Sequence, residues 1–309
     1  MFSVIFPGQG SQSIGMGREF FDKFELVKKL FKEADEVLNL PLSKYILEGP
    51  KDKLDLTVNT QPAIFLISYS IFNVIKYELN VNLNKAKYFA GHSLGEYSAL
   101  CCAGCLSFSE TIQLLNKRGN AMQNAVPKGE GGMIAILGST VGDIEKILDE
   151  KKDDFTVEIA NDNSNGQIVV SGKNKDLDHL SIFLKEKNIK NVKLPVSAPF
   201  HCKLMSKATE VMQKEINNAN FKDANNILIS NVTANEVPNK DDLKKLLIDQ
   251  IENRVRWRES IIYMIKKGVK TYIEIGPGKV LSGLVKRINK DLKIHTINNL
   301  DDIKIIENV

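Results

Sequence analysis

A pentapeptide of the pattern Gly-x-Ser-x-Gly, Gly91–Gly95, has the residue types and spacing of a serine nucleophile. It lies where an apolar strand-like run, 88–90, gives way to a helical run that starts near Glu96. Glycines at both ends allow a sharp turn that pushes the serine hydroxyl outward, because side chains there would collide with the neighbouring strand and helix. The helix N-terminus would stabilise charge on a carbonyl oxygen attacked by Ser93. Such short patterns also occur by chance, so the pentapeptide alone leaves the nucleophile open.

Arg118 is a second residue whose position in the sequence indicates a role in binding a charged group. It falls on a predicted helix that begins at a capping box, 107–110, and runs to about Asn124. An unpaired buried charge costs on the order of several kcal/mol, so an inward-pointing guanidinium needs an anionic partner. Position alone favours a salt bridge with Asp or Glu over an anionic substrate. The apolar neighbours that direct Arg118 inward are Leu114, Leu115, Ala121 and Met122.

A general base for Ser93 would come from the histidines. His201 lies in a proline-containing loop at the junction of two predicted domains and is the best placed of them. His92 is adjacent to Ser93, and its side chain is expected to turn away. The other two are His179, on a predicted surface helix, and His295, in a late strand.

Alternating strands and helices must position these residues. They predict a mainly parallel sheet covered on both faces, in a large domain made of residues 1–126 and 198–309. A helical pattern over 61–79 predicts a core helix with Pro62 in its first turn. A glycine loop after the first strand does not complete a dinucleotide-binding Gly-x-Gly-x-x-Gly pattern, since its last position is Ser13. The strand-like runs are 2–6, 88–90, 228–232 and 271–275.

Between the two parts of the large domain, residues 127–197 form a predicted small domain. Its order of elements, β-α-β-β-α-β, is that of the ferredoxin-like unit. The polar stretch 161–166 is predicted to be the turn between its second and third strands. The strands are expected at 133–137, 156–160, 167–171 and 192–196, and the helices at 141–148 and 177–187.

Composition excludes several classes of function. Among 309 residues, 42 Lys and Arg against 38 Asp and Glu leave a net charge of +4, too balanced and dispersed for a nucleic-acid binder. No uninterrupted apolar run reaches the roughly 18 residues of a membrane span. The four cysteines are expected to be small apolar fillers rather than a metal site. We expect a cytoplasmic protein, or one of an organelle stroma if a transit peptide was removed.

Five separated motifs together resemble the malonyl-CoA:acyl-carrier-protein transacylases of fatty-acid synthesis, over nearly the whole chain. The resemblance implies a hydrolase-like α/β domain that carries a ferredoxin-like insert, in agreement with the division predicted from periodicity. The motifs are Phe6–Gln12, Gly91–Glu96, the helix of Arg118, Pro199–His201 and Glu274–Gly278.

The resemblance also implies roles for individual residues. Ser93 matches the nucleophile and His201 its base, oriented by a main-chain carbonyl near Gln250. Arg118 matches the group that binds the malonyl carboxylate, in place of the salt bridge that its position favours. The backbone N–H groups of Gln9 and Leu94 match the oxyanion hole, Asn161, Asn163 and Gln250 match polar cleft positions, and Phe200 matches a ring that crowds an α-methyl branch.

The implied function is malonyl transfer from malonyl-CoA to the phosphopantetheine thiol of acyl carrier protein through a malonyl-serine intermediate. It implies no metal, no cofactor, and neither nucleic acid nor membrane as a partner. A serine hydrolase or thioesterase is the alternative, because the motif does not tell water from a thiol as acceptor. A carrier-binding scaffold is a third possibility. Residues that could dock an acidic carrier, with solvated surface as the alternative, are Lys185, Lys187, Lys190, Lys193, Arg254, Arg256 and Arg258.

Overall fold

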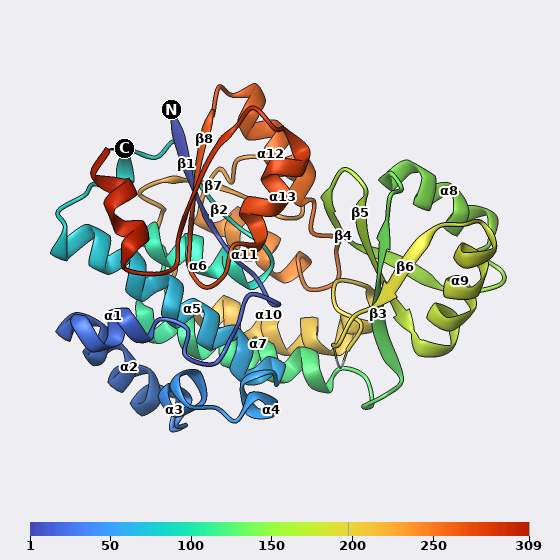
Figure 1. Cartoon of the computed structure of the whole chain (residues 1–309). Coiled ribbons are helices and arrows are strands. Elements are labelled where there is room, and N and C mark those ends of the chain that lie inside the picture. The colour runs from blue at the N-terminus through green and yellow to red at the C-terminus, as the bar shows by residue number, and fades with distance from the viewer. Residues whose placement is uncertain (197, 309) are drawn as a thin grey trace.

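The computed structural model, which describes residues 1–196 and 198–308, contains two sheets that lie beside each other (Figure 1). The first has five strands in the order β7-β2-β1-β8-β9, and every neighbouring pair is parallel. This confirms the predicted parallel sheet. Its strands are β1 (Phe2–Phe6), β2 (Tyr88–Gly91), β7 (Ile227–Ile229), β8 (Thr271–Ile275) and β9 (Lys293–Ile297).

The second sheet is antiparallel, with the order β4-β5-β3-β6. In the numbering of its own unit this order is 2-3-1-4, which is the ferredoxin-like arrangement predicted from the sequence. The division into domains at 127 and 197 stays a prediction, and residue 197 lies outside the described residues. The unit consists of β3 (Gly131–Leu137), α8 (Val141–Glu150), β4 (Val157–Ser164), β5 (Gln167–Lys173), α9 (Asn174–Glu186) and β6 (Lys190–Lys193).

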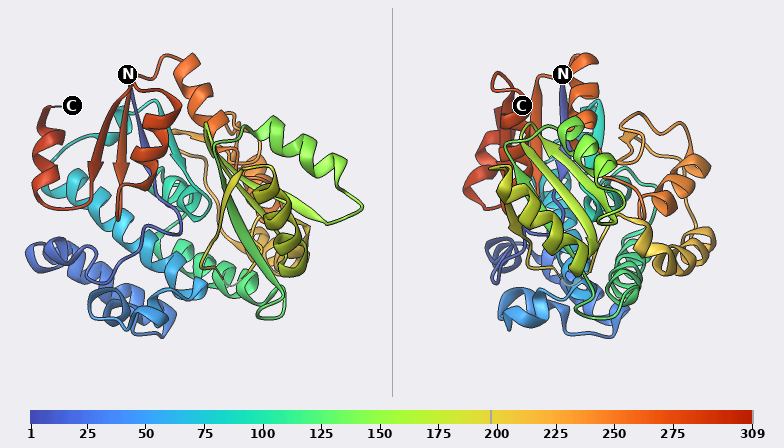
Figure 2. Two further views of the ribbon diagram at one scale, coloured as in Figure 1. Left: turned by 45° about the vertical axis from the view of Figure 1, so that its right-hand side comes forward. Right: turned by 90° about the vertical axis from the view of Figure 1, so that its right-hand side faces the viewer.

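Helices cover both faces of the parallel sheet, as Figure 2 shows from two further sides. Along β1, Val4 and Phe6 belong to a core with α5, α6 and α7, whereas Ile5 packs with α12 and α13. This alternation explains why the strand is apolar at successive positions. The helices are α1 (Arg18–Lys23), α2 (Glu25–Leu38), α3 (Leu42–Leu47), α4 (Lys51–Leu54), α5 (Thr57–Asn73), α6 (Leu94–Cys102), α7 (Phe108–Asn124), α10 (Ser206–Asn218), α11 (Lys240–Asp249), α12 (Trp257–Lys266) and α13 (Val280–Ile288), with shorter helical turns at Val74–Glu78, Leu83–Lys85, Lys203–Met205 and Asp301–Asn308.

The core helix α5 begins four residues before the predicted start, so Pro62 lies inside it rather than in its first turn. Proline has no N–H to donate to the carbonyl of Val58, four residues earlier. The side-chain amide of Asn116 donates to that carbonyl instead, at 3.2 Å. Within the described residues, Thr57–Glu78 is long and apolar enough to cross a membrane by length and composition, and 89% of its most apolar window is buried inside the protein.

Candidate active site

Ser93 occupies the turn between β2 and α6 with backbone angles of φ 53° and ψ −112°. The two glycines allow this turn because the chain segments approach very closely. A Cβ atom on Gly91 would lie 1.9 Å from the carbonyl of Gly95, and one on Gly95 would lie 2.3 Å from the carbonyl oxygen of Phe6. Neither position has room for a side chain, which is the collision expected for a nucleophile turn.

Asn231, just past the neighbouring strand β7, stabilises this turn. Its Oδ1 accepts a hydrogen bond from the Ser93 N–H at 2.7 Å, and its Nδ2 donates to the Gly91 carbonyl at 2.7 Å. Sequence reasoning missed this residue. The available signal was its place just past β7, because the carboxyl ends of neighbouring parallel strands meet at one edge of a sheet.

His201 lies directly against Ser93. Its Nε2 is 2.8 Å from Ser93 Oγ, and its Nδ1 is 2.8 Å from the carbonyl oxygen of Gln250, the contact that the resemblance implied. Burial, and after it the charge of Arg118, lowers the pKa of His201 to about 3. The ring is therefore neutral, and with Nδ1–H donating to the carbonyl, Nε2 is free to accept the serine proton.

Arg118 is buried beside this pair, with an exposed fraction of 1%. Its Nη1 donates to Gln61 Oε1 at 2.7 Å, and its Nη2 donates to Gln250 Oε1 at 2.8 Å and to Ser93 Oγ at 3.1 Å. Among the described residues no acidic side chain forms an ion pair with it. The salt bridge favoured by position alone is therefore not formed, because neutral amides hold the guanidinium. Gln61 is a second residue that sequence reasoning did not assign to the site.

A cavity of about 610 Å³ joins these groups. Its lining includes Ser93, Arg118 and His201 together with the predicted residues Gln9, Leu94, Asn161 and Phe200. Gln250 and Asn163 do not line the cavity, but each contacts a residue that does. Gln250 contacts Arg118, and Asn163 Oδ1 is 2.8 Å from Nε2 of His92.

The polar stretch predicted as a turn at 161–166 is largely strand, because β4 continues to Ser164. Its polar side chains have partners in the parallel-sheet part of the chain, which explains a strand without an apolar pattern. Asp162 is fully buried and accepts three hydrogen bonds from Arg258, and its N–H donates to the Val255 carbonyl at 3.0 Å. These contacts fix the wall of the cavity that contains Asn161.

The three arginines considered for carrier docking form ion pairs within the chain. Arg254 pairs with Glu145 at 2.8 Å, Arg256 with Glu259, and Arg258 with Asp162. A charge already paired contributes less to attraction of an acidic partner. Lys193 likewise pairs with Asp178, at 3.6 Å. The hypothesis that basic residues dock an acidic carrier is therefore narrowed to Lys185, Lys187 and Lys190.

Glu96 is a buried carboxyl group next to the site. Burial raises its pKa from the ordinary 4.5 to about 7, although hydrogen bonds from Gln250 and Asn231 act in the opposite direction. The folded protein thus binds this proton more tightly than the unfolded chain does. Its contribution to stability is full below pH 4.5 and is lost as the pH rises through 7.

Replacing Glu96 by glutamine removes this titration and is expected to change the pH dependence of stability. The free energy of unfolding of E96Q minus that of the wild type should be more positive at pH 8 than at pH 5, by up to about 3 kcal/mol. Urea unfolding of both proteins at the two pH values measures it. The comparison cancels pH-independent effects of the substitution, and an equal difference at both pH values would contradict the raised pKa.

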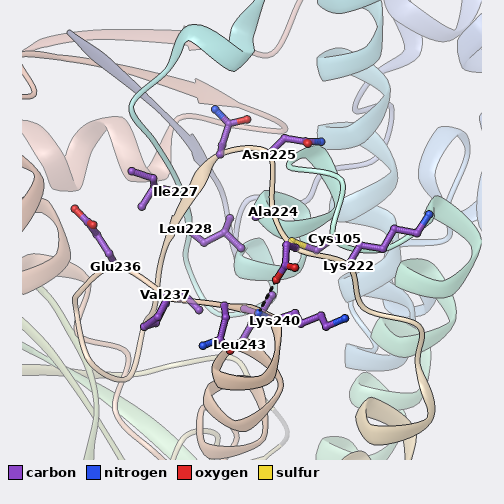
Figure 3. Close-up of a pocket in the computed structure, with 14 residues that line it drawn as sticks. Cys105, Lys222, Ala224, Asn225, Ile227, Leu228, Glu236, Val237, Lys240 and Leu243 are labelled. Carbon is purple, nitrogen blue, oxygen red and sulfur yellow. Dashed lines mark hydrogen bonds between the residues drawn. The ribbon is translucent and has the colours of Figure 1, made fainter.

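Other parts of the described chain lack comparable chemistry. A cavity of about 470 Å³ lies between β7 and the N-terminal end of α11 (Figure 3) and contains Cys105, whose pKa burial raises to about 12. Such a thiol is unreactive at neutral pH. The described residues include no group of three or more His, Cys, Asp or Glu placed to hold a metal ion, and the four cysteines are free and buried.

Comparisons with known proteins agree with this geometry. The chain matches the acyl transferase domain family over residues 3–304. It is 44% identical, over 305 residues, to the malonyl CoA-acyl carrier protein transacylase of Bacillus subtilis (strain 168), covering 98% of this chain and 95% of that protein.

Solved structures resemble the chain over nearly its whole length. The acyl-carrier-protein-S-malonyltransferase from Bartonella henselae superposes with a TM-score of 0.96 at 43% identity, covering 99% of this chain and 98% of that one. A malonyl-transacylase solved in complex with its type II PKS acyl-carrier protein gives 0.95 at 35% identity, covering 100% and 99%. By its sequence, its fold and the extent of both matches, the chain belongs to the acyl transferase domain family.

Proposed function

We propose that this protein transfers the malonyl group from malonyl-CoA to the phosphopantetheine thiol of acyl carrier protein. The observation that carries the proposal is Arg118, a buried guanidinium held by neutral amides with Nη2 only 3.1 Å from Ser93 Oγ. A carboxylate on the substrate would supply the anionic partner that such a group requires. The names of the relatives, and the solved complex of one of them with its carrier protein, support the same donor and acceptor.

The first half-reaction forms an acyl-enzyme. His201 Nε2 takes the proton from Ser93 Oγ, and the serine oxygen attacks the thioester carbonyl carbon. The negative charge on the carbonyl oxygen is stabilised by the N–H groups of Gln9 and of Leu94, the first residue of α6. The carbon–sulfur bond then breaks, and the sulfur of coenzyme A takes the proton from His201.

The second half-reaction reverses the first with a new thiol. The phosphopantetheine thiol of the carrier protein gives its proton to His201 and attacks the malonyl-serine carbonyl. Ser93 leaves and recovers its proton from the same histidine. All covalent steps use side chains of this chain and the two thiols, so we propose no metal or cofactor. We also propose a cytoplasmic location.

Two residues account for selectivity. The planar fork of Arg118 can meet a carboxylate with two parallel hydrogen bonds, which orients the thioester carbon against Ser93. A carboxylate bound there would also offset the cationic charge that helps to lower the pKa of His201, and so would strengthen the base. Phe200 lines the cavity and would crowd a branch on the α-carbon of the substrate.

The proposal is tested by the fate of the acyl group. We expect malonyl-CoA to add a malonyl mass to the protein faster than methylmalonyl-CoA or acetyl-CoA adds its own acyl group. The adduct should persist in buffer and disappear when a pantetheine thiol or holo-carrier is added, with the acyl group recovered on the thiol. Intact-protein mass spectrometry over time measures both steps. Rapid loss to water without a thiol would favour the serine hydrolase, and no adduct with any donor would favour the scaffold.

A further inference from the structure

Glu96 is a buried carboxyl group that reaches the cavity only through neighbouring residues. It lies on α6 with an exposed fraction of 1% and does not line the cavity. Its Oε2 accepts hydrogen bonds from Gln250 Nε2 at 2.7 Å and from the Asn231 N–H at 3.2 Å. Its Oε1 has no hydrogen-bond partner among the described residues. The mechanism above gives this costly buried group no task.

The contact between Glu96 and Gln250 matters because one end of the Gln250 amide faces hydrogen-bond acceptors and the other end faces a donor. On one side, Nε2 donates to Glu96 Oε2 at 2.7 Å, to the Ser93 carbonyl at 3.1 Å and, more weakly, to Asn231 Oδ1 at 3.4 Å. On the other, Oε1 accepts from Arg118 Nη2 at 2.8 Å. Turning the amide over would place its NH₂ against the guanidinium and its oxygen against a carboxylate and a carbonyl. Glu96 therefore makes one orientation of the amide strongly preferred.

That orientation determines where the guanidinium points. Arg118 is held at Nη1 by Gln61 and at Nη2 by Gln250, so both amide oxygens are needed to fix the plane of the fork. Without an acceptor at position 96, the Gln250 amide would lose the strongest contact that favours its observed orientation. In the reversed orientation its NH₂ group would repel Arg118 Nη2. Loss of the fork's orientation would weaken binding of a carboxylate more than binding of a donor that lacks one.

We propose that Glu96 is a positioning residue for recognition of the malonyl carboxylate, acting through the Gln250 amide on the orientation of Arg118. The proposal rests on the proposed function and deepens it. It predicts that Glu96 affects the ratio of malonyl to acetyl transfer. The second contact of Glu96, with Asn231 beside Ser93, would by contrast affect both donors equally.

The test compares E96L, which removes the acceptor, with E96Q, which keeps an acceptor oxygen in a side chain of the same shape. Rates of Ser93 acylation by malonyl-CoA and by acetyl-CoA are measured on the full chain at pH 8, where most of Glu96 is ionised because its pKa is about 7. We expect E96L to lower the malonyl-to-acetyl ratio about tenfold, the equivalent of one charge-assisted hydrogen bond. E96Q should keep the ratio within about threefold, because its amide oxygen can still accept from Gln250.

A double-mutant cycle with Q250L shows whether the effect passes through the amide. Q250L keeps the main-chain carbonyl that His201 contacts. The ratio in E96L/Q250L should equal that in Q250L alone, since Glu96 then has no amide to orient. Equal losses for both donors in E96L, or independent effects in the cycle, would overturn the proposal.

The readouts also separate this proposal from the function itself. If the wild type forms no malonyl adduct, the proposed function fails. If the wild type forms it but E96L keeps the wild-type ratio, only the role of Glu96 fails. Should E96L not fold, E96M removes the carboxyl acceptor with an unbranched side chain of similar length and is read in the same way: a tenfold lower ratio supports the proposal, and the wild-type ratio overturns it.

Discussion

Ser93→Ala is expected to abolish the malonyl adduct and to lower malonyl transfer by roughly four orders of magnitude or more. The hydroxyl that His201 contacts at 2.8 Å is the atom that would form the covalent intermediate, and alanine removes it without altering the turn. Intact-protein mass spectrometry after incubation with malonyl-CoA detects the adduct, and transfer to holo-carrier gives the rate.

Ser98→Ala is the matched control for this experiment. Ser98 lies on the same helix, α6, is fully buried and does not line the cavity. The control should acquire the malonyl mass at the wild-type rate. If the Ser93 variant acquires as much malonyl adduct as the wild type, the nucleophile is another residue and the proposed mechanism is wrong.

Arg118→Ala is expected to reduce acylation by malonyl-CoA by two to three orders of magnitude, while acetyl transfer changes far less. The variant loses two charge-assisted hydrogen bonds to the carboxylate, which together are worth about 3–4 kcal/mol. It also removes a positive charge that lowers the pKa of His201, so the histidine becomes a stronger base for either donor. The ratio of kcat/KM for malonyl-CoA and acetyl-CoA measures the selective part.

Two further variants test whether the effect is specific to Arg118 and whether it depends on the shape of the guanidinium as well as on its charge. Lys117→Ala removes the neighbouring cation on the same helix, which forms an ion pair with Glu215 at the surface, and should leave the ratio unchanged. Arg118→Lys keeps a charge but not the fork, so its ratio should fall between the wild type and the alanine variant. Equal losses with both donors in Arg118→Ala would exclude carboxylate recognition as its role.

Predictions from the sequence succeeded where the physical cause is local. The spacing of Gly91 and Gly95 around Ser93 encodes a turn that no larger residue permits. Helical periodicity placed Arg118 on a buried face, and Ser107 with Glu110 forms the capping box that starts its helix. The strand and helix order of the inserted unit followed from hydrophobic patterns, and the ferredoxin-like sheet followed from that order.

Predictions from the sequence failed where a contact with a residue distant in the sequence overrides the local pattern. Pro62 lies inside a helix because Asn116 compensates the carbonyl that proline leaves without a donor. The polar residues after Ala160 continue a strand because their partners, among them Arg258, lie across the boundary between the two sheets. Burial of Arg118 predicted a salt bridge, and neutral glutamines took that place.

The sequence by itself determined the nucleophile turn, the inward-facing arginine and the order of elements, since each depends on residues within a few positions of one another. Only the tertiary structure decided what surrounds them. Ser93 and Asn231 are 138 residues apart, Gln61 and Arg118 are 57 apart, and Glu96 and Gln250 are 154 apart. Ser93 meets Asn231 because the parallel sheet places β7 next to β2 and brings the ends of both strands together, and Gln61 meets Arg118 because α5 packs against α7. No local pattern specifies such contacts, because each needs the whole order of strands to be fixed first.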